Sequence, residues 1–245
     1  MGVVHLSIAS YNIHSCVGRD GRTDSARIAR IIRELDPDII ALQEVRSHFG
    51  EMMDAHQLNC LAKATGLEGI AGPTTFRPDS HYGNALLTRY RALAVRRLDL
   101  SVAGAREPRG ALDVDLQAGG MVIRVIATHL GLHASERREQ VKRLLTGLTA
   151  KGSGPVVFLA DINEWLPLSR PLRWLRAHFG SFPAPRTFPA LFPLFALDRI
   201  WISPQAALIK TEVSAYKTPL ARLASDHLPV KAKIAVAIHR ANRVV

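Results

Sequence analysis

Residues 156–165 of this sequence read VVFLADINEW, an apolar run that ends in charged and amide side chains. Asp161 and Asn163 lie two positions apart, so in extended backbone their side chains point the same way. A carboxylate at the end of a buried run can bind a cation or take a proton from water. Asp and Asn are also common turn formers, so this stretch alone leaves a structural role open.

The same pattern recurs where other apolar runs stop or start. Asn12 ends LSIASYN, His129 lies near the end of VIATHL, and Asp198 lies at the start of LDRIWIS. Asp226 and His227 immediately precede LPVKAKIAV. Each of these residues alone could be a turn former. Together they indicate that polar groups gather at the ends of buried segments.

Glu44 is the carboxylate hardest to explain as a turn residue, because it lies inside ALQEV with apolar neighbours on both sides. A buried carboxylate is costly unless it meets a cation or a full set of donors. Oxygen ligands without nearby cysteines favour Mg²⁺, or Mn²⁺, over structural Zn²⁺. The candidate carboxylates Glu44, Asp161 and Asp226 are far apart in sequence and can converge only through the fold.

Apolar runs of strand length must position these side chains. Several are apolar at nearly every position, which is typical of strands buried on both faces. In ALDVDL, by contrast, Leu112, Val114 and Leu116 share one face. The expected strands span residues 3–11, 38–42, 85–88, 92–100, 111–116, 122–128, 156–160, 197–202 and 229–237.

Helical signals lie between the strands, in residues 23–36, 51–66, 135–148 and 169–180. Pro and Gly predict loops at 72–80, 102–110, 151–155, 181–193 and 217–225. No long linker or repeat divides the chain, so we expect one domain over residues 1–245. Strands outnumber the dispersed helices, which favours an α/β or α+β sandwich of sheets covered by helices.

The composition is basic, with 32 Lys and Arg against 21 Asp and Glu and a formal net charge of +11. This balance fits nucleic acid, anionic lipid headgroups or phosphorylated small molecules, and it equally fits a well-solvated surface. Cys16 and Cys60 are expected to be reduced thiols. Because no signal-peptide or membrane-spanning pattern occurs, we expect a cytoplasmic protein without a transmembrane segment.

Eight motifs occur in the order seen in the endonuclease/exonuclease/phosphatase superfamily: SYNIHS, LQEV, HYGNALLTR, REPRGAL, ATHLG, LADINEW, LDRIWIS and SDHLPV. The sequence resembles this superfamily from about Ser7 to Val236. The resemblance implies a four-layer α-β-β-α sandwich, in which two mixed sheets pack face to face with helices outside. It places the site at one edge, between the sheets.

The resemblance also implies roles on the metal side of the site. Glu44 resembles the main metal ligand, and Asp226 a carboxylate beside the metal. Asn12 resembles the amide that helps to hold both the metal and the substrate phosphate. The implied cofactor is Mg²⁺, with Mn²⁺ as the alternative.

The catalytic roles follow from the same resemblance. Asp161 resembles the base that orients or deprotonates water, and Asn163 the donor to the transition-state oxygens. Asp198 and His227 resemble a carboxylate–imidazole pair, with His227 also contacting phosphate. His129 resembles a histidine that contacts phosphate or the leaving group.

This sequence differs from the family pattern at two places. Ala160-Asp161-Ile162-Asn163 stands where Gly-Asp-Phe-Asn is usual, a change at packing positions. His81 stands where relatives carry Tyr or Glu, and a contact to phosphate is expected there. Arg109, in the loop before a strand, is expected to bind phosphate because a guanidinium can donate two parallel hydrogen bonds.

Three functions are compatible with these residues. The first is a Mg²⁺-dependent phosphodiesterase acting on nucleic acid, as an endonuclease or exonuclease, which the superfamily and the basic charge favour. The second is a metal-dependent hydrolase of phospholipid headgroups or small phosphoesters such as inositol phosphates. The third, a non-catalytic binding domain, predicts gaps among the site residues, and the sequence has none.

Overall fold

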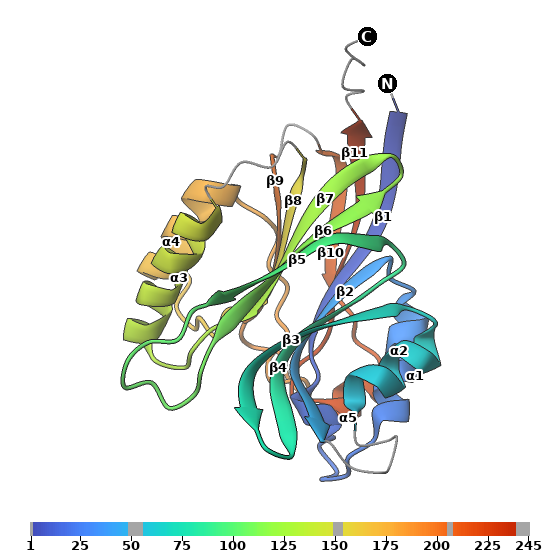
Figure 1. Ribbon diagram of the computed structural model, residues 1–245, viewed down its shortest axis with the longest axis vertical. Helices are drawn as coiled ribbons and strands as arrows, with labels where there is room; N and C mark the ends of the chain where they lie inside the picture. Colours follow the sequence, from blue (N-terminus) through green and yellow to red (C-terminus); the bar gives the residue numbers. More distant parts are fainter. Residues whose placement is uncertain (1, 49–55, 149–153, 205–207, 239–245) are drawn as a thin grey trace.

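Two mixed β-sheets form the centre of the protein (Figure 1). The computed structural model describes residues 2–48, 56–148, 154–204 and 208–238. One sheet has the order β10-β11-β1-β2-β4-β3 and the other the order β5-β6-β7-β8-β9. Only the pairs β1–β2 and β7–β8 are parallel, and the other neighbours are antiparallel.

The six-stranded sheet contains β1 (Gly2–Asn12), β2 (Ile39–His48), β3 (Glu68–Arg77), β4 (Ser80–Thr88), β10 (Leu208–Ala215) and β11 (Val230–Ile238). The five-stranded sheet contains β5 (Arg91–Asp99), β6 (Gly110–Ala118), β7 (Met121–His129), β8 (Val156–Asp161) and β9 (Asp198–Ser203). The helices are η1 (His14–Cys16), α1 (Ser25–Leu35), α2 (Gln57–Thr65), α3 (Ala134–Leu148), α4 (Arg170–Phe179) and α5 (Pro219–Ala224).

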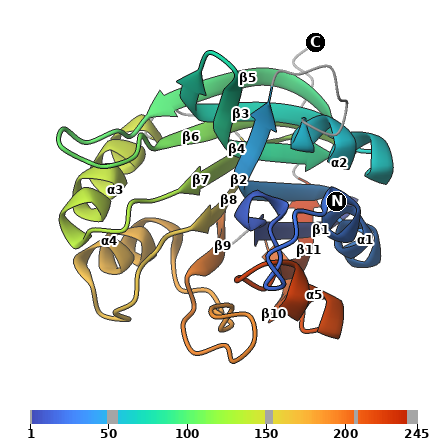
Figure 2. The same ribbon diagram turned by 90° about the horizontal axis from the view of Figure 1, so that it is seen from below.

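The apolar side chains separate into three cores, which explains the layers. Between the sheets, Ile8 and Leu86 pack with Val114, Val125 and other strand residues. A second core joins α1, α2 and α5 to the outer face of the six-stranded sheet. A third joins α3 and α4 to the outer face of the five-stranded sheet. The predicted four-layer α-β-β-α sandwich is therefore confirmed, and Figure 2 shows its helices on opposite outer sides.

Local sequence signals set the helix ends. The side chain of Asp24 accepts a hydrogen bond from the backbone of Arg27 and caps the start of α1. Asp36 ends that helix in the left-handed conformation, one residue before Pro37. Ser169 caps α4 in the same way, through the backbone N–H of Leu172. No helix among the described residues is long and apolar enough to cross a membrane.

Three segments differ from the sequence predictions. Residues 72–80, predicted as a loop, contain the second half of β3 and the turn into β4. Pro73 is tolerated there because β3 is an edge strand, and the pairing shifts register between Pro73 and Thr75. The strand β10 was not predicted, and the short helix α5 lies in the predicted loop 217–225. Of the helix predicted over residues 51–66, residues 51–55 lie outside the described residues.

A buried ion pair stabilises the outer face of the five-stranded sheet. Asp113 on β6 accepts hydrogen bonds of 2.9 and 2.7 Å from Arg124 and of 3.0 Å from Arg96. The Asp113 side chain is only 2% exposed, and that of Arg124 is 10% exposed. Removing one member of such a pair leaves the other charge buried without compensation.

We therefore expect Asp113→Ala to lower the free energy of unfolding by about 3 kcal/mol. The matched control is Asp115→Ala on the same strand. Asp115 pairs with Arg96, whose side chain is 42% exposed, so this control should cost less than about 1 kcal/mol. Urea denaturation of both variants measures the difference, and equal losses would contradict the assignment.

Candidate active site

The predicted site residues lie where parallel strands end at one edge of the two sheets. Asn12 is the last residue of β1, His129 the last of β7 and Asp161 the last of β8, while Asp198 begins β9. In parallel pairs the carboxyl ends lie side by side, so β1 with β2 and β7 with β8 bring their polar termini to the same edge. Figure 2 views the protein from this side.

Asn12 connects the two sheets. Its side-chain Nδ2 donates to Glu44 Oε1 at 3.1 Å and to Asp161 Oδ2 at 3.0 Å. Its side-chain Oδ1 accepts from the backbone of His14, and its carbonyl accepts from Ser225 Oγ at 2.7 Å. These bonds fix the amide between two carboxylates that are 117 positions apart in the sequence (161 − 44).

Glu44 occupies an irregular position in β2. Its φ of 59° is in the left-handed region, and the pairing of β2 with β4 shifts register between Leu42 and Val45. Such a break turns a side chain away from the regular alternation of the strand. The Glu44 backbone carbonyl is held by Ser15 Oγ at 3.2 Å. The irregular backbone therefore directs the Glu44 side chain toward Asn12, at the edge where the other site residues lie.

The Glu44 carboxylate has the surroundings of a cation ligand. Burial, together with the charges of Asp226 and Asp161, raises its pKa, although the hydrogen bond from Asn12 and the charge of His14 oppose this. None of the ion pairs among the described residues involves Glu44. The carboxylates of Glu44 and Asp226 offer hard oxygen donors of the kind that Mg²⁺ or Mn²⁺ prefers.

His227 lies between two carboxylates. Its Nδ1 is 2.8 Å from Asp198 Oδ2, and its Nε2 is 3.6 Å from Asp161 Oδ2. Burial alone would lower the pKa of this imidazole, but the charges of Asp198 and Asp161 outweigh burial and raise it to about 10. The ring is therefore a cation at neutral pH.

The side chains of Asp161, Asp198 and His227 offer ligand atoms within 4.8 Å of one another. A protonated imidazole has no lone pair for a metal, and its single positive charge lies between the two carboxylates. We therefore interpret this cluster as a hydrogen-bonded ion triad, and the Glu44 side as the candidate metal site.

His129 has the opposite electrostatic character. Its Nδ1 is 3.2 Å from Arg109 Nη1, and its Nε2 is 2.9 Å from the side-chain nitrogen of Asn163. Burial, reinforced by the charge of Arg109, lowers its pKa to about 3. Two buried histidines thus face Asp161, one charged and one neutral.

Asn163 is positioned by a tight turn after β8. Its φ is 48°, and its backbone N–H donates to Asp161 Oδ1 at 3.0 Å. The next residue, Glu164, pairs with Arg137 on α3 at 3.0 Å, and both side chains are buried. Arg137 also donates to the carbonyl of Gly131 at 3.2 Å. The turn is therefore anchored to the helix layer.

Three supporting residues were not predicted from the sequence. Arg137 lies in the helix predicted over residues 135–148, and the structure buries its side chain because helical spacing places it on the inner face with Val141 and Leu144. Thr187 Oγ1 donates to Asp198 Oδ2 at 2.5 Å, and it lies in an irregular loop without a recognisable signal. Ser225 directly precedes Asp226 and His227, so its position in SDHLPV could have identified it.

The remaining predicted residues surround the centre. Asp226 is half-buried, and its Oδ1 is 3.3 Å from Ser225 Oγ. Arg109 is buried and pairs with Glu107 at 3.0 Å. His81 is on β4 and lines a cavity of about 720 Å³ that also borders Glu44. His81 is thus a cavity-wall residue, and its ring packs edge-on against Phe76 at a centroid distance of 4.8 Å.

The geometry thus joins Glu44, Asn12, Asp161 and His227 in one connected cluster, as the sequence required of a single site. The sequence profile of the Endonuclease/Exonuclease/phosphatase family matches residues 9–227, a range that contains all of these side chains. The chain belongs to this family, whose members hydrolyse phosphoesters.

Individual relatives agree with this family. The "Uncharacterized protein YbhP" of Escherichia coli K12 is 33% identical over 224 residues, which cover 83% of this chain and 85% of that protein. A solved endonuclease/exonuclease/phosphatase from Beutenbergia cavernae superposes with a TM-score of 0.76 at 22% identity, over 95% of this chain and 72% of its own. The Bacteroides thetaiotaomicron mannosyl-6-phosphatase Bt3783 superposes at 0.68 with 19% identity, over 94% and 99%. At such identities the two structures share the fold and do not select a substrate.

The charge of His227 is testable. Asp198→Asn removes the carboxylate that lies 2.8 Å from Nδ1, so the pKa of His227 should fall from its raised value. NMR titration of the imidazole in metal-free protein measures this change. Asp115→Asn, on the outer face of β6, is the control and should leave the titration unchanged. A His227 titration that Asp198→Asn does not move contradicts the ion triad.

Proposed function

We propose that this protein is a Mg²⁺-dependent phosphodiesterase in which water attacks phosphorus in line with the leaving group. The observation that carries the proposal is the Asn12 amide, which holds Glu44 and Asp161 together on one side while Asp161 faces His227 on the other. Phosphoester hydrolysis needs a positioned water, neutralised phosphoryl oxygens and a stabilised leaving group. The residues of this cluster are proposed to meet these three requirements.

Glu44 and Asp226 would hold the metal, and the Asn12 amide would orient the Glu44 carboxylate through its Nδ2 hydrogen bond. When bound there, a divalent ion would polarise a phosphoryl oxygen and neutralise part of the developing charge. The raised pKa of Glu44 supports this assignment, because a cation would offset the burial and the neighbouring carboxylates that cause the shift. Mn²⁺ satisfies the same donors.

Asp161 is the proposed base. It is completely buried, and its Oδ2 lies 3.0 Å from Asn12 Nδ2 and 3.6 Å from each of the two histidine Nε2 atoms. These neighbours orient one carboxylate oxygen toward the space where water would be placed. Asp161 accepts the proton of the attacking water as the new P–O bond forms.

The other polar groups are proposed to bind phosphate. The imidazolium of His227 would face developing negative charge, where fixed donors stabilise a transition state most. Asn163 Nδ2 donates to the carbonyl of Leu130 at 2.9 Å and lies 2.9 Å from His129 Nε2, so Asn163 would hold His129 in place. Arg109 keeps its Nε–H without a hydrogen-bond partner, although the side chain is buried. A phosphoryl oxygen would satisfy that donor. The neutral His129 between Arg109 and Asn163 keeps their spacing and can approach the leaving group.

Nucleic acid and lipid or small phosphoesters remain the two substrate classes. The basic charge supports nucleic acid, the first expectation from the sequence. Phe192 and Leu194 are exposed in the loop that also contains Phe188, whose ring lies 4.8 Å from that of His227. They support the second class, because a nucleic-acid backbone offers no partner for apolar side chains. A hydrolysis screen of DNA, RNA, phospholipid and inositol phosphates, each with Mg²⁺ or EDTA, separates the two. Loss of all hydrolysis in EDTA, with recovery on Mg²⁺ addition, is the expected result.

Asp161→Asn tests the base. The substitution keeps the shape of the side chain, but both Asp161 oxygens accept hydrogen bonds, so the new –NH₂ group must face a donor and some loss of stability is expected. Turnover of bis-p-nitrophenyl phosphate should fall about 100- to 10,000-fold, the usual contribution of a general base. Steady-state kinetics and a thermal melt measure both effects. A variant that turns over like the parent shows that Asp161 is not the base.

Glu44→Gln tests the metal ligand. Because the neutral amide is a weaker ligand, half-maximal activation should need at least about tenfold more Mg²⁺. Glu68→Gln, an exposed position on β3, is the control and should follow the activation curve of the parent. Titration of activity with Mg²⁺ compares the three proteins. Identical curves for Glu44→Gln and the parent would place the metal elsewhere.

A further inference from the structure

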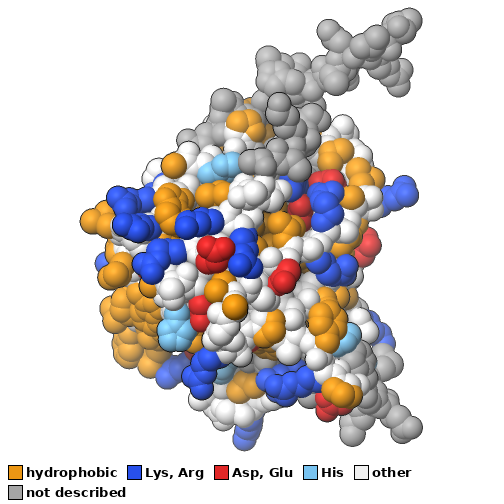
Figure 3. Space-filling view, turned by 60° about the vertical axis from the view of Figure 1, so that its left-hand side comes forward, with side chains coloured by type: hydrophobic (Ala, Val, Ile, Leu, Met, Phe, Trp, Pro, Cys, Tyr) orange, Lys and Arg blue, Asp and Glu red, His pale blue; other side chains and the backbone are white. Residues whose placement is uncertain are grey.

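Two loops beside the site expose large apolar side chains. The most exposed are Leu168 at 81%, Phe192 at 72%, Leu166 at 67% and Leu194 at 60%. We call the set Trp165, Leu166, Leu168, Leu191, Phe192 and Leu194 the apolar rim. Figure 3 shows hydrophobic side chains gathered at its left-hand edge. Exposed apolar patches of this kind mark protein or membrane contacts.

The apolar rim is presented by an ordered frame. The backbone of Phe195 donates to the carbonyl of Phe188 at 2.8 Å, and Thr187 donates to the carbonyl of Phe195 at 2.9 Å. The Trp165 ring packs edge-on against Phe188 and Phe195, with centroid distances of 5.6 and 4.6 Å. These contacts close the base of the loop, so residues 191–194 project from it.

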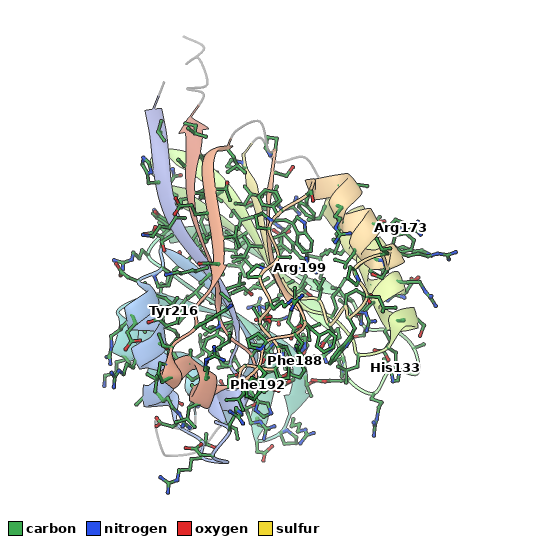
Figure 4. The ribbon with its side chains drawn as sticks, turned by 180° about the vertical axis from the view of Figure 1, so that it is seen from behind. His133, Arg173, Phe188, Phe192, Arg199 and Tyr216 are labelled. Atoms are coloured by element: carbon green, nitrogen blue, oxygen red, sulfur yellow. The ribbon has the colours of Figure 1, made fainter. Side chains whose placement is uncertain are left out.

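The same frame touches the catalytic centre. The ring of Phe188 lies 4.8 Å from that of His227, and Thr187 donates to Asp198. Trp165 follows Asn163 by two positions. Figure 4 shows Phe188 and Phe192 in this loop, seen from behind. A molecule resting on the apolar rim would therefore lie next to the groups proposed to bind phosphate.

Arginines flank the apolar rim. Arg170 and Arg186 are exposed and lie two residues from Leu168 and Phe188, respectively. Arg222 on α5 donates to the carbonyls of Ala190 and Leu191, so its charge lies at the start of the projecting segment 191–194. Exposed apolar side chains with arginines beside them match the interface of an anionic bilayer, where the apolar groups enter the acyl region and the arginines meet headgroup phosphates.

The opposite side of the site is polar. The cavity of about 720 Å³ beside Glu44 is lined by Arg46, Arg77, Arg106 and His81. A substrate held between this cavity and the apolar rim would be charged at one end and apolar at the other. Membrane phosphodiesters have this construction, with a polar headgroup joined through phosphate to acyl chains.

We propose that the apolar rim docks on an anionic phospholipid bilayer, and that the phosphodiester of a membrane lipid is the substrate. The second half of this inference rests on the proposed function. The reaction balances without a further reactant: water adds to phosphorus, one P–O ester bond breaks, and the leaving oxygen takes up a proton.

Co-sedimentation of the full chain with vesicles tests the surface. Vesicles of phosphatidylcholine alone are compared with vesicles that also contain phosphatidylglycerol. The parent should sediment with the anionic vesicles, and the double variant Phe192→Ser, Leu194→Ser should lose at least about tenfold in partition coefficient. The matched control is Leu93→Ser, Ile209→Ser, at exposed positions on β5 and β10, which should bind like the parent.

Hydrolysis of soluble bis-p-nitrophenyl phosphate is measured on the same samples, and the rim variant should retain it. The proposal is overturned if the parent protein does not sediment with anionic vesicles, or if the rim variant binds them as strongly as the parent does. So does ultracentrifugation showing that the apolar rim closes a dimer, which the rim variant disrupts. If the parent binds through the apolar rim but hydrolyses no diester with Mg²⁺, the docking surface stands while the proposed function and the lipid substrate fall.

Discussion

The buried carboxylate of Asp161 is the group on which the candidate site depends. It has no exposed surface, and hydrogen bonds or close contacts reach it from Asn12, Asn163, His129 and His227. A buried charge is stable only when donors and opposite charges compensate for lost water. Those donors come from β1, β7, the turn after β8 and the segment before β11, so the site exists only in the complete fold.

The two-sheet architecture makes this convergence simple. Each sheet contains one parallel pair, β1–β2 or β7–β8, and each pair carries polar residues to the same edge. The Asn12 side chain then spans the gap between the sheets. The helices contribute from outside, as the Arg137–Glu164 pair shows by anchoring the turn that carries Asn163. The packing between the layers therefore positions the residues of the candidate site at the edge of the sheets.

The sequence predicts the strands that are buried on both faces and the residues at their ends, because apolar runs and abrupt polar termini are local signals. It does not predict β3 and β10, since edge strands bear charges, Pro73 or Gly72 without a clear alternation. The sequence also does not show which side chains from different elements contact one another. That Thr187 meets Asp198, or that Arg137 is buried, depends on contacts between elements rather than on local pattern. Opposite charge states for two histidines likewise require their neighbours to be known.

The polar and apolar side chains around the site lie on different structural elements, namely the buried strands and the loops at the edge. Buried strands hold the reacting groups, whereas loops at the edge are free to vary and so determine what approaches them. In this chain the loop beside His227 ends in leucines and phenylalanine, and the opposite wall, beside Glu44, carries arginines. A uniformly charged polymer would leave the first wall unused, and a purely apolar ligand would leave the second unpaired. The proposed amphipathic phosphoester would contact both walls.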